Sequence, residues 1–149
     1  NSLILLLNIG SAEFQKKIID FSNSLASETN LGLIPAFWPP VFPNDEHWNL
    51  LKNNCKYEFR NYPYEFHNGG SWPMVNGFFG LALLSKDKNA DAEIILERIN
   101  HANAISEFSF YENFNTTTQE PNGVAFCAWS AAASVLVHQS LYNNFKIFF

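Results

Sequence analysis

The sequence predicts an all-α protein. Apolar residues recur every three or four positions in two stretches, which is the spacing of one face of a helix. A third stretch, about 126–142, is rich in small apolar residues, which let helices approach closely. The recurring residues are Phe14, Ile18, Phe21 and Leu25 in the first stretch and Ala92, Ile95, Ile99 and Ala102 in the second.

Length and composition indicate one globular domain. Of the 149 residues, 47% are apolar and 15% are charged, so the chain can bury a core and is not expected to be disordered. The formal net charge is −5, and the nine Lys and Arg residues are scattered along the chain. A nucleic-acid-binding surface needs clustered basic residues, so nucleic acid is not expected as a partner.

The cysteines and the N-terminal residues bear on the compartment. Cys55 and Cys127 lie far apart and have no Cys-x-x-Cys or zinc-type spacing, so they are simplest as buried thiols of a reducing, cytoplasmic environment. Leu3 to Leu7 is apolar but short, and no basic residue precedes it, so neither a signal peptide nor a membrane contact is expected. The histidines lack zinc-type spacing, so no metal or other cofactor is predicted.

The N-terminal half combines two helices with a long loop. Residues 1–9 are predicted to be the last part of an apolar helix that ends at Gly10. Ser11 is a good N-cap for the next helix. That helix places Lys16, Lys17 and Asp20 on the side opposite its apolar residues. From Thr29 to about Tyr62 prolines interrupt any helix, apart from a short one at Trp48 to Asn53. A long aromatic loop in a compact protein is usually functional.

The C-terminal half contains three further helices. Ser71 is a good N-cap and Pro73 is tolerated in the first turn, so a helix is predicted over about 72–84. A second amphipathic helix follows the polar turn at Lys86 to Asn89. The remaining expected elements are an extended aromatic segment at Phe108 to Asn115, a turn at Thr116 to Gly123, and the helix at about 126–142.

Two stretches carry candidate chemistry. Asn68-Gly69-Gly70 is a turn whose glycines permit positive φ, and it presents His67, Asn68 and Trp72 at the start of a helix, where a polar ligand could be held. Glu112 lies in an aromatic segment. A carboxylate that activates water, beside aromatic faces that hold a sugar ring, is what glycoside hydrolysis requires. From the residues alone, composition favours a surface glutamate on a loop for Glu112, and Trp38 is as readily a core residue as a stacking platform.

These stretches also resemble a known family. His67-Asn68-Gly69-Gly70, then Trp72-Pro73 and Asn76-Gly77-Phe78, resembles a signature of the α/α-toroid glycoside hydrolases. The similarity is to neutral/alkaline invertases and bacterial glycogen-debranching (amylo-α-1,6-glucosidase)-like proteins. Phe110 to Asn115 resembles their aromatic–Glu–aromatic segment, and Phe126 to Ala132 resembles their closing helix. Asn115 and Gln119 depart from the pattern, since the family commonly has Asp and Gly there.

The resemblance implies part of an (α/α)6 toroid of the six-hairpin glycosidase type, with five or six helices and long aromatic loops. It extends from about Asn8 to Tyr142 and matches the C-terminal portion of the family, so residues 1–149 are expected to be that portion of a single toroid domain. The implied site has Glu112 as the general base. The implied substrate-binding residues are His67, Asn68, Gly69, Trp72, Trp38, Tyr111 and Trp129.

The implied activity is inverting hydrolysis of a small α-glucoside or sucrose-like substrate. Such a reaction needs a second carboxyl group as general acid. Asp45, Glu46 and Glu65 are of the right chemical type, but the family's acid lies well upstream of this region. The chain is therefore expected to supply the general-base half and to be inactive alone. The alternative is a non-catalytic sugar-binding or structural remnant.

An incomplete toroid also leaves apolar side chains without their neighbours. Ile4–Leu7 and Phe145–Phe149 are the segments expected to be left exposed, with the termini the least ordered parts. A large exposed apolar surface promotes association. Self-association of the truncated toroid is therefore expected.

Overall fold

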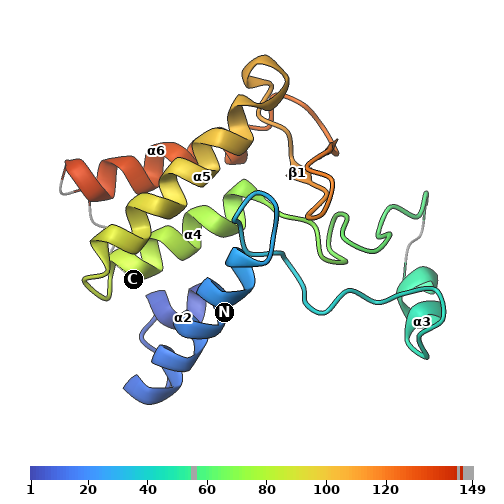
Figure 1. Ribbon diagram of the computed structural model, residues 1–149, viewed down its shortest axis with the longest axis horizontal. Coiled ribbons are helices and arrows are strands. Elements are labelled where there is room, and N and C mark those ends of the chain that lie inside the picture. The colour runs from blue at the N-terminus through green and yellow to red at the C-terminus, as the bar shows by residue number, and fades with distance from the viewer. Residues whose placement is uncertain (55–56, 144, 146–149) are drawn as a thin grey trace.

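The computed structural model describes residues 1–54, 57–143 and 145, and it is mostly helical (Figure 1). Over these residues six helices accompany one small antiparallel sheet, so the all-α class is confirmed at this level, while the toroid stays a prediction. The elements are α1 (Ser2–Leu6), α2 (Ala12–Ser27), α3 (Trp48–Asn53), α4 (Pro73–Leu84), α5 (Asn89–Phe108), β1 (Asn113–Phe114), β2 (Pro121–Asn122) and α6 (Ala128–Tyr142).

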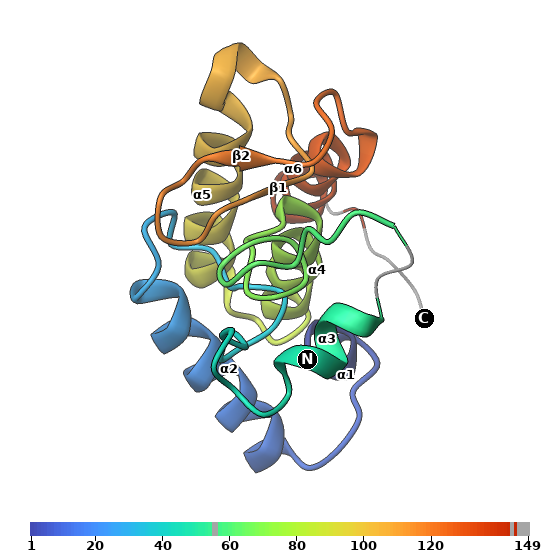
Figure 2. The ribbon, with the colours of Figure 1, turned by 90° about the vertical axis from the view of Figure 1, so that its right-hand side faces the viewer.

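Helices α4, α5 and α6 pack against one another and form the centre of the molecule (Figures 1 and 2). Glycines on α4 make the closest approach possible. A Cβ on Gly77 would lie 2.8 Å from the Cβ of Ala133, and one on Gly80 would lie 2.9 Å from a methyl carbon of Val137. Real side chains do not approach so closely. Helix α6 can therefore pack this closely on α4 only because positions 77 and 80 are glycine.

Helix α5 follows the predicted pattern and then breaks. Ala92, Ile95, Ile99 and Ala102 are all buried, as the spacing predicts. At Ile105 the backbone leaves helical geometry, and Ser106 and Glu107 have φ of 55° and 59°. Left-handed backbone is unfavourable for residues with a side chain. The break turns the chain away from the helix axis and toward β1.

Helix α2 is confirmed, but the face expected from its apolar spacing is not the buried one. Phe14 and Phe21 are 47% and 57% exposed, and of the predicted apolar positions only Leu25 is buried. The buried residues are Gln15, Ile19, Ser22, Leu25 and Ala26. Small side chains on this face allow close packing, and the Gln15 amide donates to the carbonyls of Ile9 and Gly10. Close packing and the hydrogen bonds of Gln15 thus decide which face of α2 is buried, and Phe14 and Phe21 are left exposed.

Several predicted boundaries and roles are corrected. Ser11 does cap α2 by accepting the Phe14 amide at 3.2 Å, but Ser71 does not cap α4. The N-cap of α4 is Trp72, and the fully buried Ser71 hydroxyl lies 3.0 Å from the Thr116 hydroxyl. Helix α3 has the predicted bounds Trp48–Asn53.

Three further expectations are revised. Only Asn113–Phe114 of the expected extended segment forms a strand, and it pairs with Pro121–Asn122 inside the expected turn. Helix α6 begins at Ala128, two residues after the expected start. Ile4–Leu7 is not uniformly exposed, because Leu5 is 0% exposed in the core. The expectation for the C-terminus falls largely on residues 146–149, outside the described residues.

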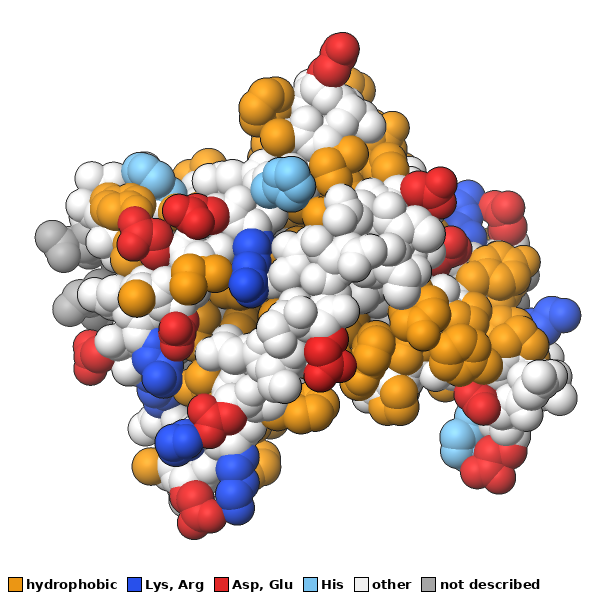
Figure 3. Space-filling model, in the orientation of Figure 1, with side chains coloured by type: hydrophobic (Ala, Val, Ile, Leu, Met, Phe, Trp, Pro, Cys, Tyr) orange, Lys and Arg blue, Asp and Glu red, His pale blue; other side chains and the backbone are white. Residues whose placement is uncertain are grey.

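The described residues of 35–62, which are 35–54 with α3 and 57–62, form an arm that stands away from α4, α5 and α6 (Figure 1). No residue of α3 is buried. Hydrophobic side chains gather on the surface of this region (Figure 3), and Phe37, Phe42 and Tyr62 are each at least 40% exposed. Over the described residues, none of the helices combines the length and apolarity needed to span a bilayer.

Candidate functional site

The loop from Tyr64 to Ser71 has a backbone that requires glycine. Gly69 has φ of 101°, and Tyr64 and Phe66 also have positive φ. At Gly70 an added Cβ would lie 2.6 Å from both the backbone nitrogen and the backbone oxygen of Phe66. Glycine is the residue that accepts such a conformation and such a contact without strain. The Gly69-Gly70 pair therefore makes this compact loop possible.

The loop is hydrogen bonded to the segment that follows Glu112. Ser71 and Phe114 exchange two backbone hydrogen bonds of 2.9 Å as an isolated antiparallel bridge. The Asn113 side-chain oxygen accepts the Phe66 amide at 3.1 Å. The Thr116 amide donates to the Tyr64 carbonyl at 3.1 Å. Two of the three stretches that carry the sequence resemblance thus lie together at one end of α4, α5 and α6.

His67 and Trp72 form a stacked pair. Their ring centroids are 4.9 Å apart and the rings are nearly parallel, at 9°. Trp72 is 6% exposed, and its indole N–H donates to the Phe66 carbonyl at 2.9 Å, whereas His67 is exposed. The histidine covers one face of the tryptophan. A ligand at this point would therefore meet His67 before it met Trp72.

Asn68 is 1% exposed, and its side chain is engaged with backbone groups of the arm. Its oxygen accepts the Val41 amide at 2.7 Å, and its nitrogen donates to the carbonyls of Val41 at 2.8 Å and Asn61 at 3.0 Å. This amide holds both ends of residues 42–60 against the loop. In this arrangement Asn68 and Gly69 build the loop.

Asn76 fixes the start of the arm in the same way. Its side chain accepts the Ile34 amide at 2.8 Å and donates to the Ile34 carbonyl at 2.9 Å. The Ala36 amide donates to the Gly70 carbonyl. These bonds fix the backbone just before Trp38. The Trp38 side chain is half-buried, and its ring centroid is 6.1 Å from that of Tyr64. Trp38 thus borders the glycine-rich loop.

Glu112 is half-buried and lies over the β1–β2 hairpin. Its Oε2 accepts the Val124 amide at 3.4 Å. A Cβ on Gly123 would lie 2.2 Å from Oε2, and Gly123 has φ of 79°, so the carboxylate occupies space that only glycine leaves free. Tyr111 packs on the core, and its carbonyl accepts the Ser130 hydroxyl at 2.8 Å. The hairpin and the start of α6 therefore fix the position of Glu112.

Trp129 lies in the first turn of α6 and is 45% exposed. It lines an apolar cleft of about 130 Å³ between α4 and α6 together with Met74, Phe78 and Leu136. Ser130, its neighbour, is the residue that binds the Tyr111 carbonyl. The structure thus connects Trp129 to the segment of Glu112 and to the first turn of α4.

Cys127 is a neighbour of Glu112 that sequence reasoning did not connect with the site. Burial raises the pKa of the Cys127 thiol above its ordinary value, and the negative charge of Glu112 raises it further. The thiol is 5% exposed and free. Cys127 was expected to be a buried thiol, and this is confirmed, whereas Cys55 lies outside the described residues. The separation of Cys127 and Glu112 in the sequence gives no indication that the two side chains are close in the structure.

Asn113 is a second residue that the sequence did not single out. It is fully buried, and while its oxygen binds the Phe66 amide, its amide nitrogen has no partner in the described part of the chain. The same holds for the nitrogen of Asn122, its partner in the β1–β2 pair. Two buried donors would be satisfied by a shared acceptor such as a water molecule.

The described residues contain no group of three or more His, Cys, Asp or Glu side chains placed to hold a metal ion. Asn115, where the family commonly has Asp, uses its oxygen locally to accept the Thr117 and Thr118 amides, each at 3.0 Å. Its nitrogen donates to Glu65 at 3.3 Å. Asn115 therefore shapes the turn after β1.

In the comparisons with known proteins, the chain matches no protein-family model, and no curated protein is significantly similar to it in sequence.

Proposed function

We propose that this chain forms the general-base half of an inverting glycoside-hydrolase site that acts on a small α-glucoside or a sucrose-like substrate. The observation that carries the proposal is the bridge between Ser71 and Phe114. It joins the loop of His67 to the segment of Glu112, which are two of the three stretches that resemble the toroid hydrolases. A water-activating carboxylate and sugar-contacting residues would then share one end of the helices.

Glu112 has the surroundings that a general base needs. Its Oε2 is held by the Val124 amide, while Oε1 has no partner among the described residues. One carboxylate oxygen is thus oriented by the protein and the other is open to a water molecule. In an inverting reaction this water would lose its proton to Glu112 as it attacks the anomeric carbon from the face opposite the leaving group.

The other site residues divide into two groups. His67 and Trp129 are exposed and would contact the sugar directly, and Trp38 and Tyr111 would border it. Asn68, Gly69 and Trp72 are buried, and they support the sugar contacts by fixing the loop beneath His67. The resemblance implies that these three residues bind substrate. They would contribute to binding by fixing the backbone of the loop.

The arrangement of the helices supports the toroid part of the proposal. Helices α4 and α6 run in the same direction and pack directly on each other, and α5 runs in the opposite direction beside them (Figures 1 and 2). An (α/α) toroid is built from helical hairpins with this alternation, whose inner helices are parallel neighbours. Exposed Phe14 and Phe21 on α2 would meet further helices or, in the isolated chain, a second copy.

A non-catalytic sugar-binding role is the second candidate, and the state of the remaining carboxylates favours it. Asp45 accepts the Phe42 amide at 2.6 Å, Glu46 faces His47 at 3.3 Å, and Glu65 accepts from Asn115. Each of these three carboxylates is engaged elsewhere. The isolated chain is therefore expected to show no turnover of sucrose or maltose.

Hydrolysis of α-glucosyl fluoride tests the general-base proposal, because fluoride is a good leaving group that departs without strong help from a general acid. We expect release of fluoride above the spontaneous rate, and its loss in Glu112→Gln. Nuclear magnetic resonance titration with maltose provides the binding measurement at His67 and Trp129. Sugar binding without fluoride release would support the non-catalytic candidate, and the absence of both would overturn the proposed function in either form.

A further inference from the structure

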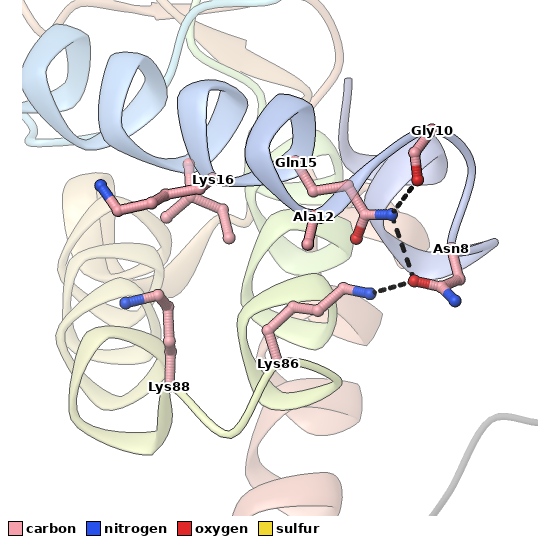
Figure 4. A pocket seen from close by; sticks show the side chains of 8 residues that line it. Asn8, Gly10, Ala12, Gln15, Lys16, Lys86 and Lys88 are labelled. Atoms are coloured by element: carbon pink, nitrogen blue, oxygen red, sulfur yellow. Dashed lines mark hydrogen bonds between the residues drawn. The ribbon is translucent and has the colours of Figure 1, made fainter.

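A cleft of about 400 Å³ lies at the opposite end of α4 from the glycine-rich loop (Figure 4). Its walls are the first turns of α2 and the turn that joins α4 to α5. Helix α4 has 12 residues, so the two ends are about 18 Å apart at 1.5 Å per residue. The cleft is thus separate from the candidate sugar site. Its volume is within the range of small-molecule pockets.

The cleft gathers positive charge in an acidic protein. Lys16, Lys86 and Lys88 line it, which is three of the nine Lys and Arg residues of a chain with net charge −5. None of the described residues that line it is acidic. Two carboxylates reach it from outside, because Asp20 pairs with Lys16 at 2.5 Å and Asp91 lies 3.8 Å from Lys88.

Those ion pairs leave the lysines available. The side chains of both pairs are at least 38% exposed, and exposed ion pairs are worth little, so an anionic ligand can compete for the ammonium groups. Lys86 has no carboxylate partner in the described part of the chain, and its Nζ donates to the Asn8 side-chain oxygen at 2.7 Å. The charge of Lys86 is therefore not neutralised by a neighbouring acid.

The opposite wall is fixed in place by a buried amide. Gln15 is 6% exposed, and its nitrogen donates to the side-chain oxygen of Asn8 and to the carbonyls of Ile9 and Gly10. Figure 4 shows these side chains converging beside the start of α2. The first-turn amides of this 16-residue helix carry the positive end of its dipole. Gly10 and Ala12, on either side of the cap, line the cleft.

We propose that this cleft binds a small organic phosphate. The phosphate group would lie between the lysines and the first turn of α2, and the organic part would lie along the apolar stems of the lysines and Ile19. Ammonium groups and helix N-terminal amides favour phosphate oxygens. The inference does not depend on the proposed hydrolase function, because the two sites share no residue.

Amide chemical shifts of the full chain test the proposal. Inorganic phosphate and glucose 6-phosphate are titrated at constant ionic strength, with chloride and glucose as matched probes. We expect saturable shifts at Ala12, Gln15 and Lys88 with both phosphates and none with chloride or glucose. Shifts caused by glucose alone would report the sugar site at His67, so the two proposals fail separately.

Two variants and one control assign the site. Lys86→Gln with Lys88→Gln should weaken phosphate binding at least tenfold. Ala12→Glu should abolish it by placing a carboxylate in the cleft, while an acidic residue in the first turn favours the helix itself. Lys17→Gln is the control, since Lys17 pairs with Glu13 and does not line the cleft. No saturable binding, or equal loss in the control, would overturn the proposal.

Discussion

Helix α4 and the arm of residues 35–62 lie on either side of the glycine-rich loop in the sequence and are held in the fold by different forces. Eight of the 12 residues of α4 are buried, whereas α3, the helix of the arm, buries none. The arm is held at its ends by the side-chain amides of Asn68 and Asn76. Apolar burial depends on area and tolerates rearrangement, while these amides depend on particular donors and acceptors. The arm can therefore open without unfolding of the helices.

The largest expected effect compares an apolar side chain in each region. Phe79→Ala should lower the free energy of unfolding by about 3–5 kcal/mol, because Phe79 is 1% exposed in the core and its loss leaves a cavity. Leu50→Ala should change it by less than about 0.5 kcal/mol, since Leu50 is 66% exposed on α3. Urea denaturation measures both. Equal losses would mean that α3 belongs to the core.

Asn68→Ala tests how the arm is held. The change removes the hydrogen bonds that the Asn68 side chain makes with backbone groups of Val41 and Asn61, and the loss of a buried hydrogen-bond partner costs about 1–3 kcal/mol. Amide hydrogen exchange should become faster across 41–61 and much less so within α4. Asn49→Ala, an exposed change on α3, is the control. Uniformly faster exchange in both regions would show that the arm and the helices unfold together.

Gly123→Ala should destabilise the hairpin that supports Glu112. Left-handed backbone costs a residue with a Cβ about 1–2 kcal/mol, and this Cβ would also collide with the Glu112 carboxylate. The same change in a Glu112→Ala background should cost less, because the collisions with Oε2 and Cδ are gone, while the left-handed backbone and the 2.8 Å approach to the Cβ of residue 112 remain. Urea denaturation of the four proteins gives the difference. An unchanged penalty would place the carboxylate elsewhere.

The smallest expected effect concerns the Cys127 thiol, measured in a Cys55→Ser background. Burial and then Glu112 raise its pKa, so iodoacetamide should react slowly at pH 8. Glu112→Gln removes the second cause and should modestly increase the rate. Because the folded pKa lies above the unfolded one, the thiol's contribution to stability is present below the unfolded pKa and is lost as pH rises through the folded pKa. A Cys127→Ala variant should lack that loss.

Sequence reasoning was reliable where a signal was local. Periodicity identified α2 and α5, the residues of the first turn identified α4, and small apolar residues identified α6. Ser11 was correctly assigned as a cap because its partner is three residues away. It failed where the deciding contact was distant. The Asn68 oxygen binds an amide 27 positions away, the Asn76 oxygen one 42 positions away, and the Asn113 oxygen one 47 positions away. The buried face of α2 was misassigned because the apolar spacing gives no weight to the polar Gln15, whose amide donates to neighbouring carbonyls.

The amide of Asn68 also bears on how the length of the chain could change during evolution. It binds Val41 on one side of the arm and Asn61 on the other, so a single residue closes the base of everything between them. The described residues among 43–58 therefore leave and return at one point of the fold, and Trp48 packs on Phe59 with the ring centroids 5.2 Å apart. Insertions or deletions there would cost little beyond loop-closure entropy, about 0.6 kcal/mol for each doubling of length. We expect exposed positions there, such as Asn49 and Leu50, to diversify while the helices and the loop of His67 keep their geometry.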